Sequence, residues 1–372
     1  MTPTPASVID RPRGAPADPV DWELAARVAR RIAGRDSLAD SYLASSLRSD
    51  FASLTEEAEA LVAEYTGLRA PTPARAEVLD RTGWIDANVT SMQRLLSPLA
   101  QRIAKRNTRA GRSIAGTELG ALLGWFSQRV LGQYDLLVPD DTDGRSTDAV
   151  YYVGTNVLGL EKRFAFRPRD FRLWIAIHEV THRAQFSAVP WMRDYFVGLV
   201  SEALGAVDTD PRRIAHALLR AAEELRAGRD PLGDGGIVGM LASPEHREVL
   251  GRVQALMSVL EGHGNRVMNE LGREHVAGQE RMARVLQARR HTGGLTGFTH
   301  KALGLESKMR QYEVGERFLE AVEREVGPRA IDHAWQGPEF LPTLHELQAP
   351  LEWLARVQRE SPSAAGAWNA TR

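Results

Sequence analysis

The sequence predicts a mainly helical α+β protein, built as a helical bundle with a small β-sheet. Two observations support this prediction. Apolar residues recur at helical spacing through most of the chain, and only one short run has the composition of a buried strand. The first helix is predicted over residues 22–32, where Trp22, Ala25, Val28 and Ile32 fall at helical spacing.

Three further helical segments are predicted before the strand. Residues 37–66 are predicted to be helical in two pieces, because the Thr-Glu-Glu sequence at Thr55 has the character of a second helix start. The other two helices are predicted over residues 84–103, where Pro98 favours an interruption, and over residues 116–132, which are strongly apolar.

The strand is predicted at residues 149–153, whose sequence AVYYV is rich in β-branched and aromatic residues and follows a polar turn. Pro168 and Asp170 then mark the start of a helix that continues to Phe186, because proline and aspartate are favoured in a first helical turn. The remainder is predicted to be largely helical, with a short helix around Trp353 near the end.

Composition excludes several kinds of function. The chain has 372 residues and a formal net charge of −1, which does not favour nucleic acid or an anionic membrane as a partner. It has no cysteine, so any metal must be held by His, Asp or Glu. No run approaches the ~20 apolar residues that cross a membrane, and the first 20 residues do not resemble a signal peptide. We therefore expect a cytoplasmic protein.

The expected domain organisation has three parts. Residues 1–19 are rich in proline and are predicted to be disordered. Residues 20–360 are long enough to bury a sizeable core and are predicted to form one large domain, with two lobes around a cleft as a variant of this arrangement. Residues 361–372 are predicted to be a flexible tail.

A metal-binding motif lies in the helix that follows the strand, which reads FRLWIAIHEVTHRAQF. His178 and His182 are four residues apart, so a helix places both imidazoles on one face, where they can bind one cation. Glu179 is rotated by about 100° from His178. From there it can take a proton from water that a zinc ion has acidified. The motif therefore predicts a catalytic zinc site with Glu179 as the general base.

A third protein ligand is predicted in the buried helical segment LMSVLEGHGNRVM. Glu261 is the favoured ligand, because a buried carboxylate requires a partner and a metal supplies one. The alternative is His263, which otherwise is a candidate donor to a transition-state oxyanion. Asn265 is a candidate to hydrogen-bond a ligand imidazole from outside the metal site. Gly262 and Gly264 allow a close approach of another backbone or a ligand.

Together, these segments resemble the zincin-2 family of zinc-dependent metalloproteases, an actinobacterial group with one branch associated with coenzyme F420 biosynthesis. The resemblance rests on WIAIHEVTHRAQF, LMSVLEGHGNRVMN, GLESKMRQYEVGERF, AWQGPEFLPTLHEL and PLEWLARV, and it extends from about Trp84 to Val357. It implies a mainly helical zincin-like fold, a zinc ion on His178 and His182, and a third ligand within the EGH segment. Arg183 departs from the generic zincin motif, in which an uncharged residue usually follows the second histidine.

A polar cluster in the segment GLESKMRQYEVGERF includes Tyr312. A tyrosine that reaches the site can polarise a substrate carbonyl, which makes Tyr312 a further catalytic candidate. The alternative interpretation is a helix surface on which the tyrosine is half-buried.

The predicted function is zinc-dependent hydrolysis of an amide bond in a peptide or small amide, with a zinc-activated water and Glu179 as the base. Two alternatives remain open. The first is a metal-dependent hydrolase of a non-peptide amide such as a glutamyl conjugate. The second is a non-catalytic zinc-binding accessory protein linked to coenzyme F420 biosynthesis. An exposed strand edge that can pair with an extended peptide would favour the protease, and a closed site with four protein ligands would favour the accessory protein.

Overall fold

The structure of the protein is a computed structural model. The described residues are mostly helical, at 78%, with one three-stranded sheet, which confirms the predicted fold class. None of their helices combines the length and hydrophobicity needed to cross a membrane. The described parts of the chain are residues 18–36, 42–103, 108–136, 149–205, 244–291 and 305–360.

The chain divides into two compact units, and the predicted tail at 361–372 lies outside the described residues, as do 1–17 of the predicted N-terminal segment. The first unit comprises residues 1–35 and 81–128, and the second comprises residues 36–80 and 129–372.

The first unit contains three helices, α1 (Trp22–Ala33), α3 (Arg81–Ile103) and α4 (Arg109–Ser127). Helix α1 confirms the predicted helix, and its N-cap Asp21 accepts a hydrogen bond from the backbone N–H of Leu24 at 3.0 Å. Helices α1 and α4 pack closely, because a Cβ atom on Gly120 would lie 2.4 Å from the carbonyl oxygen of Ala25. Pro98 does not interrupt α3.

The second unit contains the sheet and the remaining helices. Its elements in chain order are α2 (Tyr42–Thr66), β1 (Arg75–Leu79), β2 (Gly132–Tyr134), β3 (Ala149–Val153), α5 (Gly154–Phe164), α6 (Pro168–Ser187), α7 (Met192–Gly205), α10 (Pro244–His275), α11 (Gln279–His291), α13 (Leu305–Val326), the 3-10 helices η1 (Ala330–Trp335) and η2 (Pro338–Phe340), α14 (Leu344–Gln348) and α15 (Pro350–Glu360).

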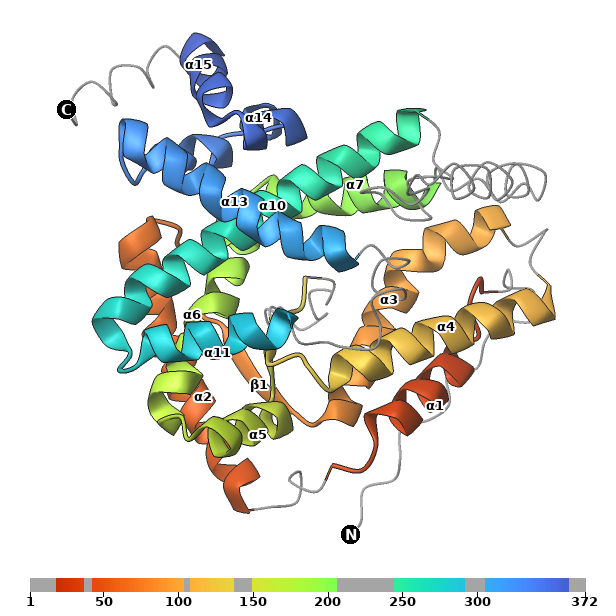
Figure 1. The fold of residues 1–372 in the computed structure, drawn as a ribbon. Helices are drawn as coiled ribbons and strands as arrows, with labels where there is room; N and C mark the ends of the chain where they lie inside the picture. The colour runs from red at the N-terminus through yellow and green to blue at the C-terminus, as the bar shows by residue number, and fades with distance from the viewer. Residues whose placement is uncertain are drawn as a thin grey trace, which may run out of the picture. The chain divides into compact units, whose positions relative to one another are not determined.

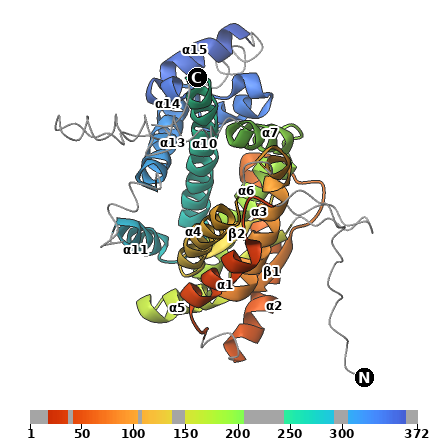
Figure 2. The same cartoon turned by 90° about the vertical axis from the view of Figure 1, so that its right-hand side faces the viewer.

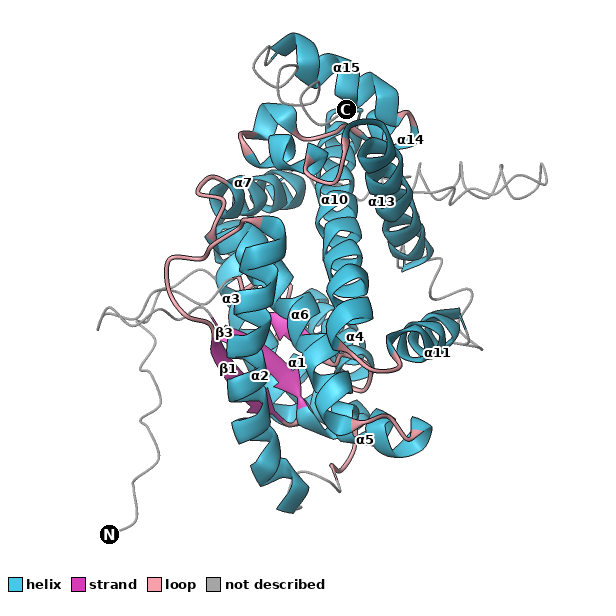
Figure 3. Ribbon diagram, turned by 90° about the vertical axis from the view of Figure 1, so that its left-hand side faces the viewer, coloured by secondary structure: helices cyan, strands magenta, loops and turns pink. Residues whose placement is uncertain are grey.

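The predicted strand is confirmed as β3, the central strand of the sheet, and all five of its residues are buried. It pairs in parallel with β1 and antiparallel with β2, and Figure 3 shows the sheet beside α2 and α6. Neither outer strand was predicted. The helix predicted over residues 116–132 instead starts at Arg109 and ends at Ser127, and Gly132 already belongs to β2.

Helix α2 is a single helix, so the break predicted at Thr55 is wrong. The Thr55 hydroxyl does not cap a helix but shares a 2.8 Å hydrogen bond with the buried hydroxyl of Tyr152 in β3. One turn earlier, the ring of Phe51 stacks on that of Tyr152 with the centroids 3.9 Å apart. A tertiary contact thus accounts for the polar residue inside the helix.

Helix α10 connects two hydrophobic cores among the described residues of the second unit. Val259 and Leu260 belong to the core formed with α7, α13 and α15, whereas Val267 and Leu271 belong to the core formed with α2, α6 and the sheet. Figures 1 and 2 show α10 beside α13. The residues between the two cores, 261–265, carry the predicted third ligand.

The crossing of α10 and α13 requires glycine on both helices. A Cβ atom on Gly262 would lie 2.6 Å from the carbonyl carbon of Gly315, and one on Gly315 would lie 1.9 Å from the carbonyl oxygen of Ser258. The close backbone approach expected at Gly262 is thereby confirmed. Because Gly262 separates Glu261 from His263, this contact fixes the position of both side chains relative to α13.

Candidate metal centre

Helix α6 begins where the sequence predicts, with Pro168 in its first turn and Asp170 close to its N-terminus. Its apolar side chains, among them Leu173, Trp174 and Ile177, are buried in the core of the second unit. This packing fixes the rotation of the helix about its axis. It therefore also fixes the direction of the two motif histidines, which lie on another face of the same helix.

The imidazoles of His178 and His182 converge. Their Nε2 atoms are 3.2 Å apart, and their rings meet edge to face at 82° with the centroids 4.5 Å apart. Glu261 of α10 approaches the same point, with its Oε2 atom 3.5 Å from Nε2 of His182 and 4.0 Å from Nε2 of His178. These three groups are the potential metal ligands that cluster within 4.8 Å in the described part of the chain.

The geometry of this cluster fits a tetrahedral divalent cation. Ligand atoms at ~2.0–2.1 Å from a tetrahedral ion are separated from one another by about 3.3 Å, close to the separations of 3.2, 3.5 and 4.0 Å in this cluster. The backbone also leaves room for the rings, because a Cβ atom on Gly264 would lie 3.0 Å from Cε1 of His182 and 3.4 Å from Cε1 of His178. Two imidazoles and one carboxylate are a donor set that suits zinc.

The electrostatics of the cluster favour a cation. Burial lowers the pKa of His182, but the hydrogen bond and the charge of Glu261 outweigh this effect and raise the pKa to about 9. The negative potential that holds a proton on His182 is the same potential that would attract a metal ion at this point. The site therefore has both the ligands and the charge for a divalent cation.

Glu179 lies beside the cluster and is not one of the three converging groups. Its side chain is buried against β2, where a Cβ atom on Gly132 would lie 2.8 Å from Oε1 of Glu179. The backbone of Tyr134 in the same strand hydrogen-bonds to the carboxylate. Burial is the main cause that raises the pKa of Glu179 to about 7, a value suited to an acid–base group at neutral pH.

His263 lies away from the metal-ligand cluster. Its Nδ1 atom is 2.9 Å from the amide nitrogen of Gln185, and its ring meets Trp335 at a centroid distance of 5.2 Å. The structure thus brings Glu261, rather than His263, to the two imidazoles. Burial lowers the pKa of His263 to about 3, so the ring is neutral. Its suggested catalytic role stays a prediction.

The amide in contact with a motif histidine belongs to Gln185, whereas the sequence suggested Asn265 for this role. Oε1 of Gln185 lies 2.9 Å from Nδ1 of His182. Sequence reasoning missed this residue, although its spacing of three from His182 places both on one helix face. Asn265 is buried in α10.

Arg183 points away from the histidines and is almost completely buried, with 1% of its side chain exposed. It donates hydrogen bonds to Oε1 of Glu59 at 2.6 Å and to the carbonyl oxygen of Thr72 at 2.5 Å. The charged residue that departs from the generic zincin motif therefore serves to join α6 to α2. It does not enter the metal cluster.

Tyr312 lies in α13, but its side chain is outside the part of the chain that the structure describes, so its catalytic role stays a prediction.

Gly132 and Tyr134 were not singled out from the sequence. Their position against Glu179 depends on the pairing of β2 with β3. The three residues of β2 are too few to show the alternating pattern from which a strand is predicted.

Two comparisons with known proteins found a match to this chain. A family model described as zincin-like metallopeptidase matches residues 20–354. A solved structure from Chloroflexus aurantiacus, described as a "putative hydrolase with a novel fold", is 31% identical, covers 91% of this chain and 99% of its own, and superposes with a TM-score of 0.66. Among curated proteins, none matches this chain.

Proposed function

This chain belongs to the zincin-like metallopeptidase family, and on that premise we propose that it hydrolyses a peptide amide bond with a zinc ion held by His178, His182 and Glu261. The observation that carries the proposal is the position of Glu179, which lies beside the three converging ligand groups without being one of them. A purely structural zinc site is normally closed by four protein ligands and needs no such neighbour.

Bound at this point, zinc would polarise the substrate carbonyl and bring the pKa of water toward about 7. Glu179 would accept the proton of that water at a carboxylate oxygen and deliver it to the leaving amine. The backbone of Tyr134 holds this carboxylate in place, and burial brings the pKa of Glu179 to about 7, where the group can both accept a proton and give it up again at neutral pH.

The edge of the sheet supports a peptide as substrate. Val153 N–H donates to the carbonyl of Leu131 at 2.9 Å, and Asp135 N–H donates to that of Ala149 at 3.1 Å. Because the backbone groups of an antiparallel pair alternate, those of Gly132 and Tyr134 are directed away from β3, and the backbone of Tyr134 reaches the carboxylate of Glu179. An extended peptide added along β2 would bring its amide groups beside the general base.

The decisive experiment combines two variants that separate metal binding from hydrolysis. Glu179→Gln should bind zinc as the wild type does and lose hydrolysis of a quenched fluorescent peptide library. Glu261→Gln should lose most of the zinc affinity, measured by competition with a chromophoric chelator, because the carboxylate ligand is gone.

Two results would contradict the proposal. Full activity of Glu179→Gln would exclude it as the base, and unchanged zinc affinity of Glu261→Gln would exclude it as a ligand. Hydrolysis of a γ-glutamyl anilide without any peptide hydrolysis would favour the small-amide alternative. Stoichiometric zinc without hydrolysis of either substrate class would favour a non-catalytic role.

A further inference from the structure

Gln185 is fully buried at the end of α6 and makes three polar contacts with its terminal amide. Oε1 lies 2.9 Å from Nδ1 of His182, and Nε2 lies 2.9 Å from Nδ1 of His263. Nε2 also donates a 3.0 Å hydrogen bond to the carbonyl oxygen of Leu260, the residue before Glu261. One side chain thus connects a motif histidine to the backbone that carries the third ligand.

The contact with Leu260 determines the orientation of the amide. A backbone carbonyl can only accept a hydrogen bond, so the atom of Gln185 that faces it must be the nitrogen. The amide oxygen therefore faces His182, and because an amide oxygen can only accept, Nδ1 of His182 carries the proton. The second amide proton is directed to Nδ1 of His263, which must be the acceptor.

In the neutral ring, the form that binds a metal, a protonated Nδ1 leaves the lone pair of His182 on Nε2, the atom that lies 3.2 Å from Nε2 of His178 and 3.5 Å from Glu261. Histidine ligands of metals usually donate their other N–H to a carboxylate, a backbone carbonyl or water. In this chain the acceptor is a carboxamide, which is itself held by Leu260 and His263.

We propose that Gln185 is a positioning residue that fixes the tautomer and the ring orientation of His182 for metal binding through its amide oxygen, while its amide nitrogen holds α6 to α10 and so supports the fold. This inference rests on the proposed function, since it concerns the same metal site. It also assigns His263 a place in the site as the neutral acceptor that helps to hold the amide of Gln185.

The test is zinc affinity, measured by competition with a chromophoric chelator, together with the thermal stability of the metal-free protein. Gln185→Met keeps the length of the side chain but removes its amide, and should weaken zinc binding by about 10- to 100-fold. The matched control is Gln279→Met. Gln279 is a buried glutamine, with 7% exposed, and its Nε2 donates to Asn269 at 2.9 Å. This variant should lose stability and keep the zinc affinity of the wild type.

A second variant separates positioning from general support of the fold. Gln185→Glu keeps an acceptor for Nδ1 of His182 and removes both donors, so it should destabilise the metal-free protein while zinc affinity stays well above that of Gln185→Met. The inference is overturned if Gln185→Met binds zinc as the wild type does. If Gln185→Met does not fold, a tenfold or larger loss of affinity in folded Gln185→Glu overturns it.

Failure of the proposed function gives a different pattern. If the wild type and His178→Ala bind zinc equally weakly, the metal site itself is wrong. If the wild type binds zinc tightly, His178→Ala does not, and Gln185→Met matches the wild type, only the role of Gln185 is wrong. The d–d absorption bands of the Co²⁺-substituted proteins give a readout that is independent of hydrolysis and should change in Gln185→Met but not in Gln279→Met.

Discussion

Gly264 faces the imidazole of His182 so closely that a methyl group in its place would lie 3.0 Å from Cε1 and 3.3 Å from Nε2 of the ring. The two residues are on different helices, α10 and α6, and no backbone atom is involved in the predicted clash. A side chain at position 264 would therefore act directly on the metal-binding atom of His182 and only weakly on the fold.

Gly264→Ala should lower zinc affinity by about 10- to 100-fold, the range found when a group that orients a metal ligand is lost. Stability of the metal-free protein should change little, because alanine favours the helix by ~1 kcal/mol relative to glycine and offsets the contact. The control is Gly251→Ala in the same helix, where the added methyl group meets only Cδ1 of Leu344 at 3.4 Å. Equal zinc affinities of the two variants would contradict this prediction.

Gly132→Ala should impair peptide hydrolysis without weakening zinc binding, whereas Gly264→Ala weakens zinc binding. The added Cβ atom would lie 2.5 Å from Cγ and 2.8 Å from Oε1 of Glu179, so the carboxylate must move, whereas the metal ligands are not touched. We expect peptide hydrolysis to fall by ~10²–10⁴-fold, the usual contribution of a general base, with zinc affinity unchanged. Gly159→Ala, which meets nothing within 4 Å, is the control. A loss of zinc from Gly132→Ala would show that β2 supports the ligands instead.

The sequence predicts the elements that are defined by local periodicity, and it fails where pairing between distant segments decides. The pattern around Trp22 and the AVYYV run at β3 correspond to real elements. By contrast, β1 and β2 exist because β3 lies between them, and Arg75–Leu79 alone has no strand pattern. Thr55 has the local character of a helix start, yet its partner is Tyr152, 97 residues away.

The candidate site divides in the same way. A spacing of four on one helix places His178 and His182 together, so that pair follows from the sequence alone. Glu261 and His263 are two residues apart, and both have side chains that can bind zinc. The rotation of α10 about its axis, which the glycine contact with α13 sets, directs Glu261 and not His263 to the imidazoles. The role of Gln185 depends on the carbonyl of Leu260, 75 residues further along the chain.

Arg183→Met should destabilise the protein without changing zinc binding. The substitution leaves Glu59 without its 2.6 Å partner and removes the hydrogen bond to the carbonyl of Thr72, so we expect a loss of about 3 kcal/mol in the free energy of unfolding. The matched control is Arg169→Met in the same helix. Arg169 pairs with Glu57 of α2 at 2.8 Å, but the pair is exposed (62% and 37%), and its loss should cost at most ~1 kcal/mol.

Urea unfolding monitored by circular dichroism would measure both values, and chelator competition would measure zinc affinity. Equal losses of stability in the two variants would contradict the proposed role of Arg183 as a buried connection between α6 and α2. A weaker zinc site in Arg183→Met would show instead that this arginine acts on His182.

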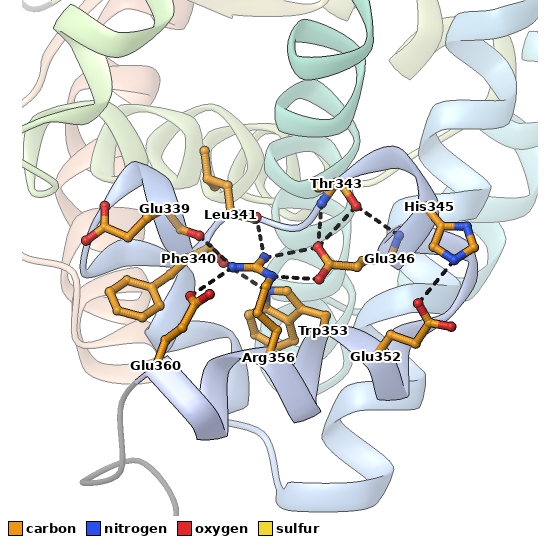
Figure 4. A network of polar contacts seen from close by, with 10 residues as sticks. All are labelled: Glu339, Phe340, Leu341, Thr343, His345, Glu346, Glu352, Trp353, Arg356 and Glu360. Carbon is orange, nitrogen blue, oxygen red and sulfur yellow. Dashed lines mark hydrogen bonds and ion pairs between the residues drawn. The ribbon is translucent and has the colours of Figure 1, made fainter. Parts of the chain in front are cut away.

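Glu346 makes the carboxy-terminal helices sensitive to acid. Its side chain accepts hydrogen bonds from Arg356 at 2.7 and 3.0 Å and from the backbone N–H of Thr343 at 2.9 Å, as Figure 4 shows. Burial raises the pKa of Glu346, but the hydrogen bonds with Arg356 and Thr343 and the charge of Arg356 outweigh it, so the pKa lies below its usual value. A carboxyl group with a lowered pKa in the folded state stabilises that state only while it is ionised.

The direction of the pH effect follows from this shift. Above the unfolded-state pKa of about 4.3, the contribution of Glu346 is complete, and it is lost as the pH falls toward the lower pKa of the folded state. The difference in unfolding free energy between the wild type and Glu346→Gln should therefore be constant from about pH 5 to 7 and shrink at lower pH. Glu352→Gln is the control, since Glu352 pairs with His345 on the surface, where 62% of its side chain is exposed. A difference for Glu346→Gln that persists or grows in acid would contradict the prediction, because it would mean that the carboxyl group stabilises the fold in its protonated form.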